Sequence, residues 1–190
     1  MQEVSIREMR QGEETRISEF VERVFARDVA PLYVKQGQTE FRNYIKVNAL
    51  AERKRAGLHF LLVAETRDKI PELAGMIEVK GCDHISLFFV SSLLQRKGVG
   101  KALMLEAIEK CKKQGSKGLT VNSSPNAVPA YERLGFIKLE EERVKNGIRF
   151  VPMKILFSDK SAKGNLYPEN MALQVGLDPI GHKKARPKDK

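Results

Sequence analysis

A glycine turn between an apolar run and an amphipathic run constrains this chain more than any other feature. Residues 85–90 are mostly apolar and predict a buried strand, and residues 102–113 have the apolar spacing of a helix with one buried face. Between them lie Gly98 and Gly100. A helix that begins at such a turn presents unpaired N–H groups and the positive end of its dipole, and glycine leaves room for an anion to approach them. The turn therefore predicts a binding site for a pyrophosphate.

The distribution of basic residues favours the same ligand. The chain carries a formal net charge of +10, and two segments account for most of it. Residues 95–118 hold seven basic and two acidic side chains, a net +5, and Arg96, Lys97 and Lys101 lie at the turn itself. Residues 182–190 hold five basic and one acidic side chain, a net +4. A polyanionic ligand accounts for the first cluster, whereas the second either stays solvated or contacts nucleic acid.

Two sequence blocks resemble the GNAT superfamily of N-acetyltransferases. The turn lacks the third glycine of a dinucleotide fingerprint and the Lys-Ser/Thr pair of a P-loop. It reads Q-x-x-G-x-G-x-A, starting at Gln95, soon after the predicted strand. The second block, residues 126–136, has Asn126 and Tyr131 on a predicted short helix followed by Leu-Gly-Phe. In this order and at this separation, the blocks are similar to the two motifs of that superfamily, whose cofactor is acetyl-CoA.

The resemblance implies where acetyl-CoA binds. Backbone N–H groups of the turn would bind the pyrophosphate, and the pantetheine arm would lie in a gap between the preceding strand and its neighbour. The N–H of Val90 would polarise the acetyl oxygen, and Asn126 would contact the arm or a bound water; read locally, Asn126 is a helix N-cap. The predicted cofactor-binding residues are Phe89, Val90, Gln95, Arg96, Lys97, Gly98, Val99, Gly100, Lys101, Asn126 and Tyr131. No metal is expected, because Cys82 and Cys111 lack metal-ligand spacing.

The resemblance also implies catalytic roles. Tyr131 matches the family tyrosine whose hydroxyl faces the sulfur, which makes it the predicted general acid; the alternative is a tyrosine that packs or only orients the cofactor. His84 lies fourteen residues before the first motif glycine, at a position where some members have a glutamate base. Its imidazole could take a proton from an ammonium, either directly or through water. Glu78, on the neighbouring predicted strand, is the second candidate base, and a chain of waters without a protein base is the third reading.

The element order predicts an α/β (α+β) fold of three layers. A mixed, mostly antiparallel sheet of six or seven strands is expected, flanked by helices, with the cofactor between two splayed central strands. Strands are predicted at residues 4–7, 59–65, 73–79, 84–90, 118–122, 136–140 and 150–157, the last two forming a closing hairpin. Helices are predicted at residues 13–26, 39–55, 102–113 and 126–134, the second with Thr39 as its N-cap.

The resemblance extends over about residues 3–157. A GNAT domain is therefore expected at residues 1–157 and a C-terminal extension at residues 158–190, with a disordered basic end. The first residues lack the apolar run of a signal peptide, and no run approaches transmembrane length. These features predict a cytoplasmic protein with no membrane partner and with reduced cysteines.

Together these features predict an N-acetyltransferase that transfers an acetyl group from acetyl-CoA directly to an amine in a ternary complex. The acceptor, a small-molecule amine or a protein amine, stays open, as does a homodimer. The acceptor pocket is expected between residues 28–38, the second helix and the closing hairpin. Two other classes are weighed: a non-catalytic acetyl-CoA or CoA sensor, which would lack Tyr131, and a nucleic-acid-binding module, which would interleave more aromatic and basic residues than this sequence does.

Overall fold

The computed structural model describes residues 3–157, and the predicted extension at residues 158–190 lies outside them. The strands are β1 (Val4–Glu8), β2 (His59–Thr66), β3 (Leu73–Lys80), β4 (His84–Val90), β5 (Gly118–Ser123), β6 (Ile137–Lys138), β7 (Arg143–Lys145) and β8 (Ile148–Leu156). The α-helices are α1 (Glu14–Asp28), α2 (Lys35–Tyr44), α3 (Val47–Arg55), α4 (Val99–Lys113) and α5 (Val128–Arg133). Two 3-10 turns, η1 (Ala30–Leu32) and η2 (Pro125–Ala127), follow α1 and β5.

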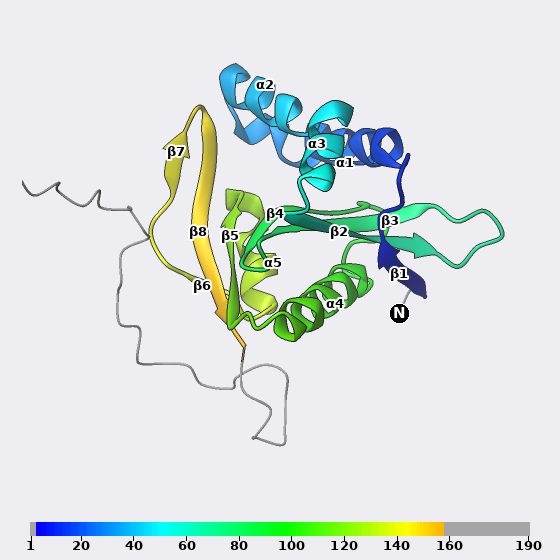
Figure 1. Cartoon of the computed structure of the whole chain (residues 1–190). Coiled ribbons are helices and arrows are strands. Elements are labelled where there is room, and N and C mark those ends of the chain that lie inside the picture. The colour runs from blue at the N-terminus through cyan, green and yellow to red at the C-terminus, as the bar shows by residue number, and fades with distance from the viewer. Residues whose placement is uncertain (1–2, 158–190) are drawn as a thin grey trace, which may run out of the picture.

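The strands form one mixed sheet between two helical layers. The strand order is β1-β2-β3-β4-β5-β8-β6, with β7 also paired to β8. Every neighbouring pair is antiparallel except β4 and β5, which are parallel. Helices α1, α2 and α3 cover one face of the sheet and α4 lies against the other (Figure 1). The predicted three-layer, mostly antiparallel architecture is confirmed.

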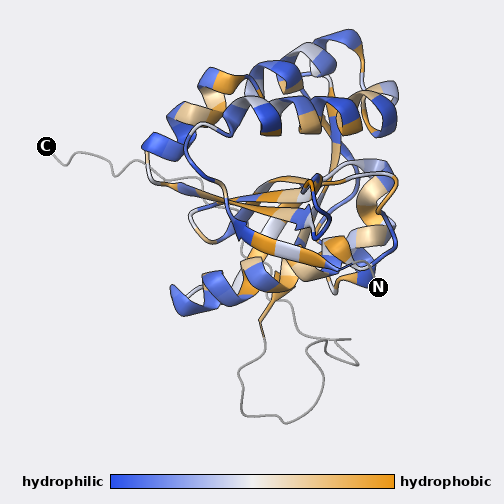
Figure 2. Cartoon of the chain, turned by 90° about the vertical axis from the view of Figure 1, so that its right-hand side faces the viewer, coloured by the Kyte–Doolittle hydropathy of each residue, from blue (hydrophilic) through white to orange (hydrophobic). Residues whose placement is uncertain are grey.

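Each face of the sheet has its own hydrophobic cluster. On the α4 side, Ile77, Ile85 and Leu103 belong to a large buried cluster that also includes Tyr131 of α5. On the α1 side, a smaller cluster joins the strands to α1 and α3. Hydrophobic residues gather in the strands, whereas the helices carry hydrophilic residues on their outer sides (Figure 2). Alternating side chains along each strand therefore divide between two different surroundings.

The closing segment differs from the single predicted hairpin. The sheet within residues 3–157 has eight strands, since β6 and β7 both pair with the long β8. The turn between β7 and β8 is Asn146-Gly147, and both residues have positive φ, 51° and 76°. This is the two-residue turn that matches the right-handed twist of a hairpin. The predicted count of six or seven strands was therefore too low, because the Asn-Gly turn creates an additional short strand.

The second predicted helix is divided in two. Residues 39–55 were expected to be continuous, but α2 ends at Tyr44 and α3 begins at Val47. Ile45 and Leu50 are both buried, and a continuous helix would place them roughly 140° apart around its axis. Breaking the helix brings both side chains onto the sheet. The predicted N-cap was also wrong: α2 begins earlier, with Val34 at the N-cap, and the Thr39 hydroxyl donates to the Lys35 carbonyl within the helix.

Candidate active site

The central parallel strands diverge soon after they meet. β4 and β5 pair only at His84 with Thr120 and at Ile85 with Val121, although β4 continues to Val90. The register between β3 and β4 also shifts here, so that Ser86 is an extra residue between two paired positions of β4. Such a bulge bends the strand locally. The result is a gap between β4 and β5 that is closed at Ile85 and open toward the glycine turn.

Backbone donors of β4 point into this gap. The Ser91 N–H donates to the Ala74 carbonyl on the β3 side, at 2.8 Å. Because successive residues of an antiparallel strand direct their N–H groups to opposite sides, the N–H groups of Val90 and Phe88 point away from β3. The N–H and the carbonyl of one strand residue point to the same side, and the Val90 carbonyl accepts a hydrogen bond from Gln95 Nε2 at 3.3 Å and not from β3. The gap is therefore lined by N–H groups that β5 does not pair with.

The glycine turn lies at the open end of the gap. Gly98 is the N-cap of α4 and has φ 92°, and Arg96 is also left-handed, with φ 61°. At Gly100, a Cβ would lie 3.3 Å from Phe88 Cζ and 3.5 Å from Val90 Cγ2. The glycines thus allow the sharp turn and let the first turn of α4 approach β4 closely. The N-terminus of a helix of this length is the element expected to bind a pyrophosphate.

Asp28, at the end of α1, connects the two sequence blocks. Gln95 Nε2 donates to Asp28 Oδ2 at 3.2 Å, and Asn126 Nδ2 donates to the Asp28 carbonyl at 2.7 Å. The Asn126 Oδ1 accepts from the Ser124 hydroxyl. Asn126 is not a helix N-cap, because that position belongs to Ala127 for α5 and to Ser124 for η2. Sequence reasoning missed Asp28, for which the local pattern carries no signal.

Tyr131 is buried on the α4 side of the sheet. Its ring centroid lies 5.9 Å from that of Phe88 and 5.2 Å from that of Phe136. Burial raises the pKa of its hydroxyl above the usual value of a phenol. The hydroxyl therefore stays protonated at neutral pH, and it is a weaker acid than an exposed phenol. The contact with Phe88 places Tyr131 next to the strand that lines the gap.

The two candidate bases share the opposite face of the sheet, but their surroundings differ. Glu78 is 3 % exposed and accepts hydrogen bonds from Arg53 at 2.9 and 3.3 Å, one to each carboxylate oxygen. His59 Nδ1 lies 3.4 Å from the same carboxylate, and burial lowers the pKa of that imidazole. Glu78 is thus held by Arg53, whereas His59 Nδ1 is buried beside the carboxylate without a hydrogen bond to it. This arrangement favours a structural ion pair over a base that exchanges protons.

His84 is more accessible than Glu78. It lies at the closed end of the gap, where its Nδ1 is 2.8 Å from Thr120 Oγ1. Burial lowers the pKa of His84, so the imidazole is neutral at pH 7 and able to accept a proton. The structure thus brings His84 to the gap together with the bulge at Ser86.

The comparisons with known proteins agree with this geometry. Residues 29–157 match the family described as Acetyltransferase (GNAT) domain. The chain belongs to the GNAT acetyltransferase family. It is similar to an uncharacterized N-acetyltransferase, YvbK, of Bacillus subtilis, with 28% identity over 148 residues, which are 70% of this chain and 82% of YvbK.

Solved structures of other GNAT proteins have the same fold. A GCN5-related N-acetyltransferase from Rhodopseudomonas palustris has a TM-score of 0.70 at 19% identity, over 83% of this chain and 98% of that one. The PaiA N-acetyltransferase from Thermoplasma acidophilum, solved in complex with coenzyme A, has a TM-score of 0.68 at 19% identity, over 82% and 99%. At this identity the likeness concerns the fold.

On the α1–α3 side of this GNAT domain, Tyr44 is a residue that sequence reasoning placed only in a helix. Arg53 lies over its ring, 3.9 Å from the centroid. Burial raises the pKa of Tyr44, and a hydrogen bond with Ser86 of the bulge opposes that shift. Tyr44 thus connects the end of α2 to the bulge and to the Arg53–Glu78 pair. Its position depends on the break between α2 and α3, which the sequence pattern did not predict.

Aromatic side chains line the same side near the end of β4. Phe25 stacks on Phe41 with ring centroids 4.0 Å apart, and Phe41 lies 5.8 Å from Phe89. Tyr33 packs at 6.0 Å from Phe25, and burial raises its pKa to about 12. These residues come from α1, the segment after it, α2 and β4, which includes the segments where the acceptor pocket was expected.

The tip of the β7–β8 hairpin closes against α2. A Cβ built on Gly37 would lie 2.2 Å from the Gly147 carbonyl oxygen, so the two backbones touch. Asn146 also donates to Glu40 of α2 at 3.4 Å. Figure 1 shows the hairpin rising toward this helix. The three segments expected to border the acceptor therefore come together.

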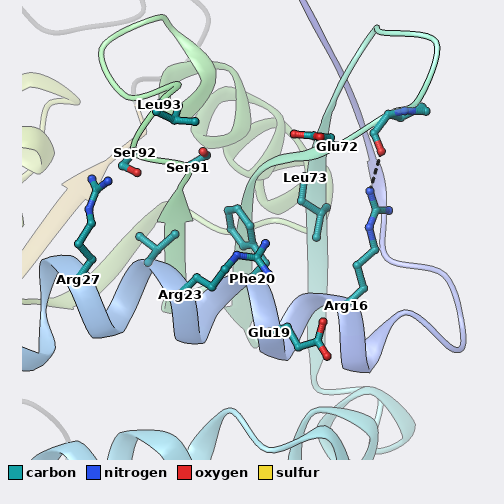
Figure 3. Close-up of a pocket in the computed structure, with 12 residues that line it drawn as sticks. Arg16, Glu19, Phe20, Arg23, Arg27, Glu72, Leu73, Ser91, Ser92 and Leu93 are labelled. Atoms are coloured by element: carbon teal, nitrogen blue, oxygen red, sulfur yellow. Dashed lines mark hydrogen bonds between the residues drawn. The ribbon is translucent and has the colours of Figure 1, made fainter.

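A separate pocket of about 610 Å³ lies between α1, the start of β3 and residues 91–93. Arg16, Arg23 and Arg27 extend from one side of α1, with Arg27 directed toward Ser92 (Figure 3). Arg16 pairs with Glu65 at 2.6 Å and donates to the Pro71 carbonyl. No residue of β5 lines this pocket, so it is distinct from the gap.

Neither a metal site nor an exposed thiol is present among the residues that the structure describes. Within residues 3–157, no cluster of three or more His, Cys, Asp or Glu side chains has the arrangement of a metal site. Cys82 and Cys111 are both buried, and burial raises the pKa of the Cys111 thiol to about 12. A thiol in that state is a poor nucleophile.

No helix in the described range is long and apolar enough to cross a membrane.

Proposed function

We propose that this chain transfers the acetyl group of acetyl-CoA to an amine by direct attack in a ternary complex. The observation that carries this proposal is the gap between β4 and β5, lined by N–H groups and open toward the N-terminus of α4. An extended thioester-bearing arm fits between two strands that part, and a pyrophosphate fits at a helix N-terminus. The coenzyme A complex of a protein with this fold supports the assignment.

The glycine turn would bind the pyrophosphate. The N–H groups of residues 96–101 would donate to it, while Arg96, Lys97 and Lys101 add positive charge. Gln95 and Asn126 border the same end of the gap through their shared contact with Asp28. Phe89 and Val90 would contact the arm. Together with Tyr131, which would face the sulfur, these are all the residues that the sequence predicted for the cofactor.

The carbonyl of the acetyl group requires a donor for its developing negative charge. Val90 was the predicted donor, and the direction of the strand offers Phe88 as well. His84 lies four residues from Phe88 and six from Val90, which are about 13 Å and 20 Å along a strand. Because the amine must reach both the base and the carbonyl, we assign the carbonyl to the Phe88 N–H and the arm to Val90. Backbone donors of this kind stabilise acyl-transfer transition states strongly.

The two proton transfers are assigned to residues on opposite faces of the sheet, His84 on the α1–α3 face and Tyr131 on the α4 face. The acceptor arrives as an ammonium ion, and His84 takes one proton from it through intervening water. The free amine forms the C–N bond as the C–S bond breaks, and the sulfur takes a proton from Tyr131. The second nitrogen proton, lost as the amide forms, replaces the Tyr131 proton through water. His84 then releases its proton to solvent, so the net reaction liberates one proton.

Glu78 is the weaker candidate for the base. Both of its oxygens accept hydrogen bonds from Arg53, and its side chain is nearly inaccessible. We infer that it holds α3 against β3 instead. On the acceptor side, the half-buried rings of Tyr33, Phe41 and Phe89 favour an amine attached to an apolar or aromatic body, while the fully buried Phe25 packs beneath two of them.

The test is an assay of free thiol released from acetyl-CoA with a panel of amines. The panel contains spermidine, an aromatic ethylamine, free lysine and a peptide with a free N-terminus. Thiol release with at least one amine, reduced roughly 10²-fold or more in Tyr131→Phe, is the expected result. Tight acetyl-CoA binding without release with any amine would instead identify a sensor and contradict the catalytic proposal.

A further inference from the structure

A short hydrogen-bond chain at the closed end of the gap joins His84 through Thr120 to the Asp83 carbonyl. Thr120 Oγ1 lies 3.0 Å from the Asp83 carbonyl oxygen and 2.8 Å from His84 Nδ1. The Thr120 backbone N–H also donates to the Asp83 carbonyl, at 2.8 Å. The threonine is therefore held on both its backbone and its side chain. Its hydroxyl lies between the Asp83 carbonyl oxygen, which can only accept a hydrogen bond, and His84 Nδ1, which donates or accepts according to its protonation.

The direction of this chain follows from the number of protons available. A hydroxyl has one proton to donate and two lone pairs, and a carbonyl oxygen only accepts. The Thr120 proton is used by the Asp83 carbonyl, so the hydroxyl oxygen is left to accept from His84. Nδ1 must then carry the hydrogen. In a neutral imidazole the other nitrogen, Nε2, keeps its lone pair.

We propose that Thr120 is a positioning residue that holds His84 as the Nδ1–H tautomer, with Nε2 as the proton acceptor for the amine. The inference rests on the proposed function for its catalytic meaning, whereas the tautomer itself is a property of the free protein. In the step it serves, the N–H bond of the ammonium breaks and the Nε2–H bond forms. The imidazolium keeps its Nδ1–H bond to Thr120 throughout.

Both side chains lie on the α1–α3 face. Ile85 and Val121 pack in the cluster on the α4 side, and their neighbours His84 and Thr120 therefore point the other way. The charged groups around His84 are Lys80 of β3, Asp83 of the preceding turn and Lys154 of β8, the cross-strand partner of Thr120. Asp83 favours the imidazolium and Lys80 disfavours it, while burial favours the neutral ring. The base is then available above the lowered pKa of His84 and is lost as pH falls through it.

The direct test is ¹⁵N NMR of histidine-labelled protein. The chain has three histidines, and His84→Gln assigns the His84 signals by their loss. At neutral pH we expect a protonated Nδ1 and an unprotonated Nε2 for His84, and a mixture of tautomers in Thr120→Val. Thr120→Ser, which retains the hydroxyl, should restore the wild-type pattern. A protonated Nε2 in the unaltered protein, or an unchanged pattern in Thr120→Val, would overturn the inference even if the enzyme is active.

Kinetics with the best amine of the panel test the catalytic meaning. Thr120→Val should lower kcat about three- to tenfold, the loss that one hydrogen bond accounts for, and leave KM for acetyl-CoA unchanged. Its pH profile should shift to lower pH, because the lost hydrogen bond favoured the charged ring. In the His84→Gln background the same substitution should have no further effect on kcat. An equal loss in both backgrounds would show that Thr120 acts on the fold and not through His84.

Discussion

The two faces of the sheet are built in different ways, although both border the gap between β4 and β5. On the α4 side, the turn and the first residues of α4 are consecutive in the chain, and the buried cluster around them is apolar. On the α1–α3 side, the polar and charged groups near the gap come from β3, β4, β5 and α3 and are joined by the Arg53–Glu78 ion pair and the His84–Thr120 hydrogen bond. The α4 side therefore depends on one continuous segment, whereas the α1–α3 side depends on residues that lie far apart in the sequence.

This difference bears on what each face does. A binding site for a common cofactor is served by a rigid, contiguous turn whose backbone makes the contacts. A site for an acceptor depends on side chains, which differ between proteins that share a backbone. The α1–α3 face of this chain should therefore be the more sensitive to charge and to distant substitutions. Four predictions test that contrast.

The largest effect on stability is expected at Glu78. Glu78→Ala leaves the largely buried Arg53 without its carboxylate partner, which should cost about 3–5 kcal/mol of unfolding free energy. The double variant Glu78→Leu/Arg53→Met, which removes both charges, should regain most of that loss. Urea denaturation measures all three proteins.

A Glu78→Gln variant separates stability from catalysis. If Glu78 is structural, acetyl transfer by the folded variant should be nearly unchanged. A fall of roughly 10²-fold or more in kcat with little loss of stability would assign the base to Glu78 and not to His84.

The next largest effect is expected where the hairpin tip meets α2. Gly37→Val places side-chain atoms where the Gly147 carbonyl now lies, which should cost about 1–3 kcal/mol or displace the hairpin. KM for the amine should rise, whereas the affinity for acetyl-CoA should stay the same. Gln36→Val, at an exposed neighbouring position of the same helix, is the matched control. Equal effects of the two variants would mean that the contact has no special role.

A smaller effect is expected in acid, at the cluster that joins β1, α1 and β2. Hydrogen bonds from Arg7 lower the pKa of Glu13 to about 2, from its ordinary 4.5. Because the pKa is lowered in the folded state, the stabilisation is complete above pH 4.5 and is lost as pH falls toward 2. Tm measured across this window should decrease less steeply in Glu13→Gln. Parallel curves for the two proteins would show that Glu13 does not contribute.

The smallest effect is expected at Arg96 on the other face. This residue has φ 61°, a left-handed conformation that costs non-glycine residues about 1–2 kcal/mol. Arg96→Gly relieves that cost. Glycine also raises the conformational entropy of the unfolded chain, which partly offsets the gain, so the net stabilisation should be up to about 1 kcal/mol. Arg96→Ala retains the strain and should show no gain. A gain in Arg96→Ala as well would point to charge as the cause.

Sequence reasoning succeeded where the structure is local. The turn between β4 and α4 and the apolar face of α1 could be predicted because neighbouring residues determine them. The order of elements along the chain was predicted from the resemblance of two sequence blocks to a known family, because local propensity alone does not determine it. The break after Tyr44 could not, since it depends on placing both Ile45 and Leu50 on the sheet. Asn146-Gly147 is a sequence typical of a two-residue hairpin turn, and the predicted strands did not include the short strand β7 that precedes it.

The residues of the α1–α3 face were harder to predict. Thr120 meets His84 only because two strands 36 residues apart are parallel partners at that point. Asp28 and Tyr44 gain their importance from contacts across the fold. No pattern within a short window of sequence carries that information. The roles of His84, Tyr131 and the cofactor-binding residues remain predictions that the experiments above address.

The most direct test of the account is calorimetric titration of acetyl-CoA into the unaltered protein and two glycine variants. Gly98 and Gly115 both have positive φ, 92° and 83°, so Gly98→Glu and Gly115→Glu carry similar backbone strain and the same added charge. Gly98 lies at the start of α4, and Gly115 lies just beyond its end with open space around it. We expect acetyl-CoA to bind the unaltered protein and Gly115→Glu alike, and Gly98→Glu at least about 100-fold more weakly, a difference of about 2.7 kcal/mol. Equal binding by both variants, or none by the unaltered protein at millimolar acetyl-CoA, would contradict the account.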